Sequence, residues 1–97
     1  FTPPACTAAK MNYFNVTNQL YSDTASADSA LKDKMKETAS NKLRAAEIRV
    51  SDKSIYDSIT ANLKDYASWI KNENSAVKSV SSNCDPNTLV IELDLIY

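Results

Sequence analysis

The chain has 97 residues, of which 43% are hydrophobic and 24% charged, and its formal net charge is -1 at pH 7. This composition is typical of a single soluble, folded domain, and the lack of a basic excess argues against nucleic-acid binding. Glycine and histidine are both absent, which excludes glycine-rich phosphate-binding loops and removes the commonest general base and the commonest zinc ligand.

Three features predict a secreted, extracellular protein. The sequence begins with Phe1 rather than methionine, as expected after removal of a signal peptide, although a trimmed sequence would look the same. Cys6 and Cys84 lie near opposite ends, and an even cysteine count in a short chain predicts a disulfide, the alternative being two buried thiols. Such a bridge would restrict the unfolded chain by roughly 4 kcal/mol. Asn15 begins an N-glycosylation sequon, which is compatible with export.

The first predicted helix covers about residues 6–21, where apolar side chains recur at intervals of three and four. The polar residues at 22–28 favour a turn and a helix cap. A second helix is predicted over about residues 29–49. Its apolar stripe consists of Leu31, Met35, Ala39, Leu43, Ala46 and Val50.

A third predicted helix, residues 52–71, is the clearest amphipathic element. Asp52 is suited to be its N-cap, because its carboxylate can accept the free backbone N–H groups of the first turn. Charged residues lie mainly on the opposite side. The apolar stripe consists of Ile55, Tyr56, Ile59, Leu63, Tyr66, Ala67 and Ile70.

The last part of the chain is less clear. Residues 75–83 are predicted as a short fourth helix, unless the third helix bends and continues. In residues 88–97 the side chains follow the two-residue period of a strand. However, Asp85 followed by Pro86 would also be a good start for a helix. The alternation favours an extended segment that lies across the helices, pairs with another chain or belongs to a longer protein.

These elements together predict an all-α fold. We expect one domain, residues 1–97, built as a small bundle of three or four helices. One long-range disulfide and an extended apolar C-terminal segment would complete it.

The sequence offers little that could catalyse a reaction. No histidine is present to activate a serine or threonine, and the two distant cysteines do not form a thiol–disulfide motif. The carboxylate pair Glu92 and Asp94 is interpreted as solvated or capping charge. We therefore expect no enzyme activity, no cofactor and no metal site.

The favoured function is a secreted, non-enzymatic binding protein that acts through its surface on a protein or another extracellular macromolecule, as effectors do. Tyr66 and Trp69 are the candidate interface, because tryptophan is enriched at binding hot spots, and the alternative is that Trp69 lies at the edge of the core. A homodimer through the C-terminal segment is a further possibility. No stretch is apolar enough to span a membrane.

The alternative function is a carrier of a small lipophilic ligand, held in a cavity between helices. The aromatic and aliphatic residues suited to line such a cavity would otherwise fill the core. They are Tyr13, Phe14, Tyr21, Tyr56, Ile59 and Leu63.

Overall fold

The computed structural model describes residues 20–82 and 89–97, and these form three helices and a four-stranded mixed sheet. In chain order the elements are β1 (Leu20–Tyr21), α2 (Thr24–Ser40), β2 (Ala45–Val50), α3 (Lys53–Thr60), α4 (Leu63–Glu73), β3 (Ser79–Ser82) and β4 (Val90–Ile96).

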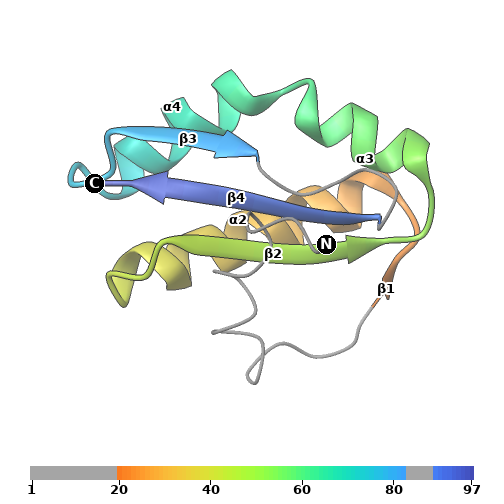
Figure 1. Ribbon diagram of the computed structural model, residues 1–97, viewed down its shortest axis with the longest axis horizontal. Coiled ribbons are helices and arrows are strands. Elements are labelled where there is room, and N and C mark those ends of the chain that lie inside the picture. The colour runs from red at the N-terminus through yellow and green to blue at the C-terminus, as the bar shows by residue number, and fades with distance from the viewer. Residues whose placement is uncertain (1–19, 83–88) are drawn as a thin grey trace, which may run out of the picture.

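The strand β4, which comes last in the sequence, lies inside the sheet. The strand order is β1-β2-β4-β3, with β1 parallel to β2 and β4 antiparallel to both of its neighbours. The helix α2 makes the crossover between the parallel strands, and α3 and α4 lead from β2 to β3 (Figure 1). Because both edges of β4 are hydrogen-bonded within the chain, neither edge is available to pair with a second copy.

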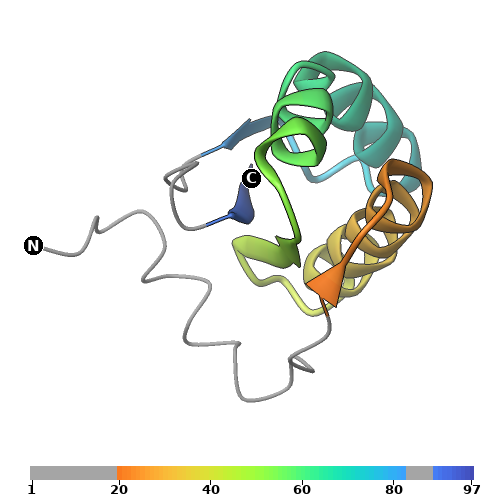
Figure 2. The same ribbon diagram turned by 90° about the vertical axis from the view of Figure 1, so that its right-hand side faces the viewer.

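All three described helices lie on one face of the sheet, which we call the inner face (Figure 2). Successive strand residues point to opposite faces, so alternate residues of β2 and β4 meet the helices. This apolar contact supplies the main favourable free energy of folding. The largest inner-face core residues are Ile48, Val50, Ile91, Leu93 and Leu95 from the strands, and Leu31, Met35, Ile59 and Ile70 from the helices.

The helices α2 and α3 begin at aspartate N-caps. The carboxylate of Asp23 accepts the backbone N–H of Ser26 at 2.8 Å, and that of Asp52 accepts the N–H of Ile55 at 3.1 Å. The bond from Ser26 lowers the pKa of Asp23, and bonds from the Ser54 hydroxyl and the Ile55 N–H lower the pKa of Asp52. The predicted N-cap at Asp52 is therefore confirmed.

The prediction of an all-α bundle is wrong. The predicted second helix ends at Ser40, and its last part, from Ala45, is the strand β2. The chain leaves the helix at Lys42, whose φ of 57° is left-handed, and the N–H groups of Lys42 and Leu43 close the last turn. Glycine usually occupies this position, so the absence of glycine concealed the helix end.

The predicted third helix is divided into α3 and α4. A turn at Ala61 and Asn62 separates them, and the Asn62 side-chain amide donates to the carbonyl of Ser58 at 3.0 Å. The predicted fourth helix at 75–83 is also wrong, because Ser79–Ser82 forms β3 and pairs with β4. Segment 88–97 contains β4, and its alternation is that of a strand buried on both faces.

The predicted disulfide is not found, and no disulfide joins any of the described residues. Cys6 and Cys84 both lie outside them, as does the predicted first helix up to residue 19. The last two residues of that predicted helix, Leu20 and Tyr21, form the strand β1.

Candidate interaction surface

The outer face of the sheet, opposite the helices, is set by the strand register. Glu47 of β2 lies directly opposite Glu92 of β4, and Ala45 lies opposite Asp94. Since side chains alternate along a strand, these four residues share the outer face with Ile96.

Exposed apolar side chains gather at one end of this sheet. Leu43 is 39% exposed, Ile96 44% and Tyr97 38%. The Tyr97 hydroxyl donates to the Leu43 carbonyl at 2.8 Å, and the N–H of Leu95 donates to the carbonyl of Arg44 at 2.6 Å. These bonds tie the end of β4 to the turn after α2, and both lie at the left end of the sheet in Figure 1. The Tyr97 hydroxyl also lies 3.5 Å from the carbonyl of Ala39 in α2, so Tyr97 turns towards the helices, whereas Ile96 is on the outer face. We call Leu43, Ile96 and Tyr97, which lie at the same end of the sheet, the apolar end.

Positive charges border the apolar end. Lys42 and Arg44 flank Leu43 in the sequence, and the backbone N–H of Lys78 donates to the carbonyl of Ile96 at 2.7 Å. All three cations are exposed. A guanidinium nitrogen of Arg44 lies 3.9 Å from the carboxylate of Asp94.

The predicted interface residues Tyr66 and Trp69 lie where α4 packs against α2. Tyr66 is only 3% exposed, and its hydroxyl donates to the Asp28 carboxylate of α2. The ammonium of Lys32 lies 6.0 Å from the centroid of the Tyr66 ring and 5.8 Å from that of Trp69. Trp69 is half-buried against the core. This pair therefore joins two helices, and its role in binding a partner stays a prediction.

Burial and the neighbouring Asp28 carboxylate raise the pKa of Tyr66. The hydroxyl therefore stays protonated and donates its hydrogen bond to Asp28 throughout the physiological range. Asp28 also pairs with Lys32 at 3.4 Å, so the contact between α2 and α4 is polar at its rim and aromatic at its centre.

The residues predicted to line a carrier cavity are dispersed. Tyr13 and Phe14 lie outside the described residues. Tyr56 and Ile59 are 7% and 1% exposed and belong to the core, against which Leu63 and Tyr21 pack. They do not meet around a common space.

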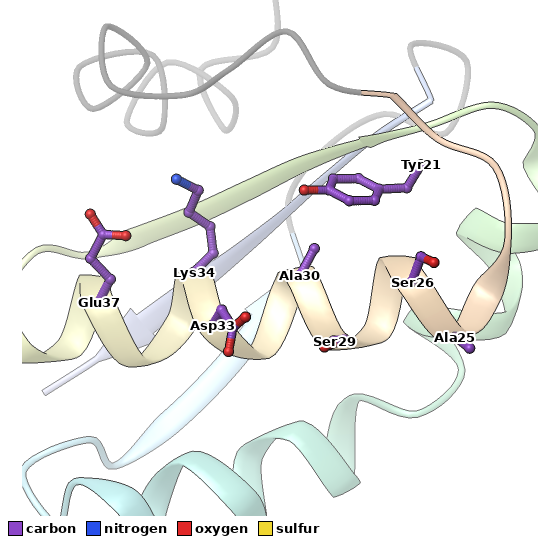
Figure 3. A pocket seen from close by; sticks show the side chains of 8 residues that line it. All are labelled: Tyr21, Ala25, Ser26, Ser29, Ala30, Asp33, Lys34 and Glu37. Atoms are coloured by element: carbon purple, nitrogen blue, oxygen red, sulfur yellow. The ribbon is translucent and has the colours of Figure 1, made fainter.

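Tyr21 contributes instead to an open groove of about 620 Å3 between β1 and α2. Figure 3 shows its ring above the helix, with the hydroxyl directed towards Lys34. The first part of α2 lines the groove with small residues, and Asp33, Lys34 and Glu37 line it further along the helix. This mixed-charge lining suits water better than a lipophilic ligand.

Three carboxyl groups are buried on the outer face. Glu47 is 7% exposed, Glu92 0% and Asp94 8%. Burial raises the pKa of Glu92 to about 8, and the charge of Asp94, a hydrogen bond with Asp94 and the charge of Glu47 act in the same direction, whereas Arg44 opposes them. Sequence reasoning treated Glu92 and Asp94 as solvated charges, because the register that places Glu47 beside them is not visible in the sequence.

Three further features considered in the sequence are a metal site, a membrane span and a glycosylation site. Among the described residues no group of three acidic or sulfur ligands is placed to hold a metal ion, and no described helix is long and apolar enough to cross a membrane. The glycosylation candidate Asn15 lies outside the described residues.

Comparison with known proteins gives no further guidance. No protein family model matches the chain, and neither the curated proteins nor the solved structures contain a match.

Proposed function

We propose that this protein is a non-enzymatic binding protein that docks an acidic partner protein on its apolar end. The observation that carries the proposal is the exposure of Leu43, Ile96 and Tyr97 at the same end of the sheet. These are three of the four large hydrophobic side chains that are exposed in the described part of the chain. The fourth, Leu20, lies at the opposite end of the sheet, beside Arg49.

The chemistry of the apolar end resembles that of a protein interface. Such interfaces combine an apolar centre with a polar rim, and tyrosine and arginine are enriched in them. The Tyr97 ring is held in place by its hydrogen bond to the Leu43 carbonyl. A fixed side chain loses less conformational entropy when a partner binds.

The charge of the border selects the kind of partner. Lys42, Arg44 and Lys78 are exposed around the apolar end, and within the described part of the chain only Arg44 of these three forms an ion pair, with Asp94. A second copy would bring like charges together, which opposes association. A partner that presents carboxylates around an apolar group would match both features of the surface.

A binding protein is better supported than a lipid carrier. Tyr56 and Ile59, which were expected to line a cavity, fill the core, and the groove beside Tyr21 carries charged residues. Action outside the cell remains a prediction from the sequence, because Cys6, Cys84 and Asn15 all lie outside the described residues.

A random-peptide library displayed on phage tests the proposal with the full chain as bait. We expect enrichment of peptides in which Asp or Glu residues adjoin a large apolar residue. The double substitution Leu43→Ser with Ile96→Ser should abolish their binding, whereas Leu20→Ser, the matched exposed leucine at the other end, should leave it unchanged. Circular dichroism would establish that both variants remain folded.

Three results would overturn the proposal. They are the enrichment of no peptide, binding that survives the double substitution, and enrichment of basic peptides. Self-association of the wild-type chain that the double substitution abolishes would identify a second copy as the occupant and exclude an acidic partner.

A further inference from the structure

We propose that the acidic partner docks as a fifth strand along β3, so that its backbone pairs with Val80 and Ser82 and one of its apolar side chains reaches the apolar end. This inference rests on the function proposed above and adds the way in which the partner is held. The juxtaposition that carries it is the border of the sheet, where β3 lies directly beside Ile96.

The strand β3 is one border of the sheet that the described residues form. The order β1-β2-β4-β3 gives it a single strand neighbour there, and the three described helices lie on the inner face (Figure 2). The residues of β3, Ser79–Ser82, are exposed or half-buried. A border strand presents backbone N–H and C=O groups to which an extended peptide can add.

The register shows which backbone groups of β3 face outwards. The N–H of Leu95 in β4 donates towards β2, to the residue just before that strand, at 2.6 Å. Because successive residues of an antiparallel strand direct their backbone groups to opposite neighbours, the residues on either side of Leu95 face β3, where their partners are Ser79 and Ser81. Val80 and Ser82 therefore direct their N–H and C=O groups away from β4.

The sequence of β3 does not block the addition of a strand. Natural border strands are commonly protected by proline, by charged side chains or by very short length. The segment Ser79–Ser82 contains neither proline nor a charged residue. The opposite border, β1, has only two residues, Leu20–Tyr21, so it offers a partner little backbone.

The border at β3 is continuous with the apolar end. Ser79 lies directly opposite Ile96, so both residues are on the outer face. Neighbouring strands are about 4.8 Å apart, so a fifth strand would lie about 10 Å from β4. Because serine is small, a large apolar side chain of the added strand can pass over Ser79 and contact Ile96.

Charge identifies the added strand as acidic. Lys78 is exposed, and its N–H donates to the Ile96 carbonyl at 2.7 Å, which places its backbone at the start of β3 beside the apolar end. A carboxylate that adjoins the apolar residue of the peptide would lie near this lysine. A second copy would present Lys78 and four uncharged residues along β3, so it lacks the complementary charge.

A synthetic copy of an acidic peptide enriched on the full chain tests this inference. N-methylation at one residue at a time removes a single backbone N–H. If the peptide is a strand, methylation of alternate residues should weaken binding about fivefold or more, and methylation of the intervening residues by less than about twofold. Fluorescence anisotropy measures each affinity.

The variant Ser82→Pro removes a matching donor from the protein. Proline is tolerated on a border strand where its missing N–H faces solvent, so β3 should stay paired with β4, and circular dichroism would establish that the chain remains folded. Peptide binding should weaken about fivefold or more, whereas Ser82→Ala, which keeps the N–H, should bind like the wild-type chain. In the wild-type chain the amide hydrogens of Val80 and Ser82 should exchange more slowly when peptide is bound, as measured by NMR.

The outcomes separate this inference from the proposed function. Peptide binding that is lost in Leu43→Ser with Ile96→Ser, but is insensitive to every N-methylation and to Ser82→Pro, would overturn strand addition and leave the proposed function intact. Failure of any peptide to bind would overturn both. Self-association of the wild-type chain that Ser82→Pro abolishes would identify β3 of a second copy as the occupant and exclude an acidic peptide.

Discussion

On β4, neighbouring residues bury opposite kinds of chemistry. Ile91, Leu93 and Leu95 point to the helices, whereas Glu92 and Asp94 alternate with them and point to the outer face. All five are at most 8% exposed. One strand therefore places an apolar row and an ionisable row about equally far from water.

The two faces respond differently to the solution. Burial of the apolar row stabilises the fold at any pH, because the transfer of hydrocarbon from water involves no proton. Burial of the carboxyl row is tolerated only while the charge there is limited, so its contribution depends on proton binding. The inner face thus provides stability, and the outer face makes that stability depend on pH.

The largest expected effect comes from opening a cavity on the inner face. Leu93 is 0% exposed and packs in the core, so Leu93→Ala should lower the free energy of unfolding by about 2–5 kcal/mol. Urea unfolding should give the same loss at pH 4.5, the ordinary pKa of a glutamate, and at pH 8, near the raised pKa of Glu92.

The matched control lies three residues further along the same strand. Ile96 is 44% exposed, so Ile96→Ala should change the free energy of unfolding by no more than about 0.5 kcal/mol. A loss for Leu93→Ala that varies with pH as steeply as wild-type stability would break the distinction between the two faces.

The sequence predicted local features better than the fold. The N-cap at Asp52 and the apolar stripe through Ile55, Ile59 and Ile70 are seen in the structure, because capping and helical periodicity depend on neighbouring residues. The strand β2 was missed because Ala46 and Val50 are four residues apart, a spacing that puts both on one side of a helix and also on one face of a strand. Ile48, between them, is the residue that favours the strand.

The candidate surface was also missed, but for a different reason from that which concealed β2. Leu43 and Tyr97 are 54 positions apart and meet only because β4 inserts beside β2. The carboxyl cluster likewise depends on pairing Glu47 with Glu92. Pairing between distant strands is fixed by the whole sheet, so periodicity within either segment carries no information about its partner.

A helix cap sharpens the comparison because its pH dependence has the opposite sign. Hydrogen bonds from Ser54 and Ile55 lower the pKa of Asp52, so its stabilising effect is present above the ordinary value of 3.8 and is lost as the pH falls through the lowered value. Asp52→Ala should lower the melting temperature by a few degrees at pH 7, and by less in acid.

The substitution Asp52→Asn separates the cap from its charge. Asparagine accepts the same backbone hydrogen bond, so this variant should keep most of the wild-type melting temperature at pH 7 and lose the acid-dependent part. Thermal unfolding followed by circular dichroism would measure both variants. An Asp52→Ala loss that grows towards low pH would contradict the assigned role of the carboxylate.

The smallest expected effect concerns the link between the carboxyl row and the apolar end. The positive charge of Arg44 lowers the pKa of Glu92, so Arg44→Gln should raise the Glu92 midpoint above about 8. The Arg44 side chain is 68% exposed and lies 3.9 Å from Asp94. Because water screens such a pair, we expect the Glu92 midpoint to rise by less than about one pH unit, as measured by carbon-detected NMR titration of the Glu92 side-chain carboxyl group.

The variant Lys42→Gln provides the control, since it removes a neighbouring exposed charge that forms no ion pair with any described residue. It should leave the Glu92 midpoint unchanged. An equal shift in both variants would mean that Glu92 responds to net surface charge rather than to the ion pair between Arg44 and Asp94. An unchanged Glu92 midpoint in Arg44→Gln would show that the guanidinium does not act on the buried carboxyl groups, and the pKa of Glu92 would then be independent of the apolar end.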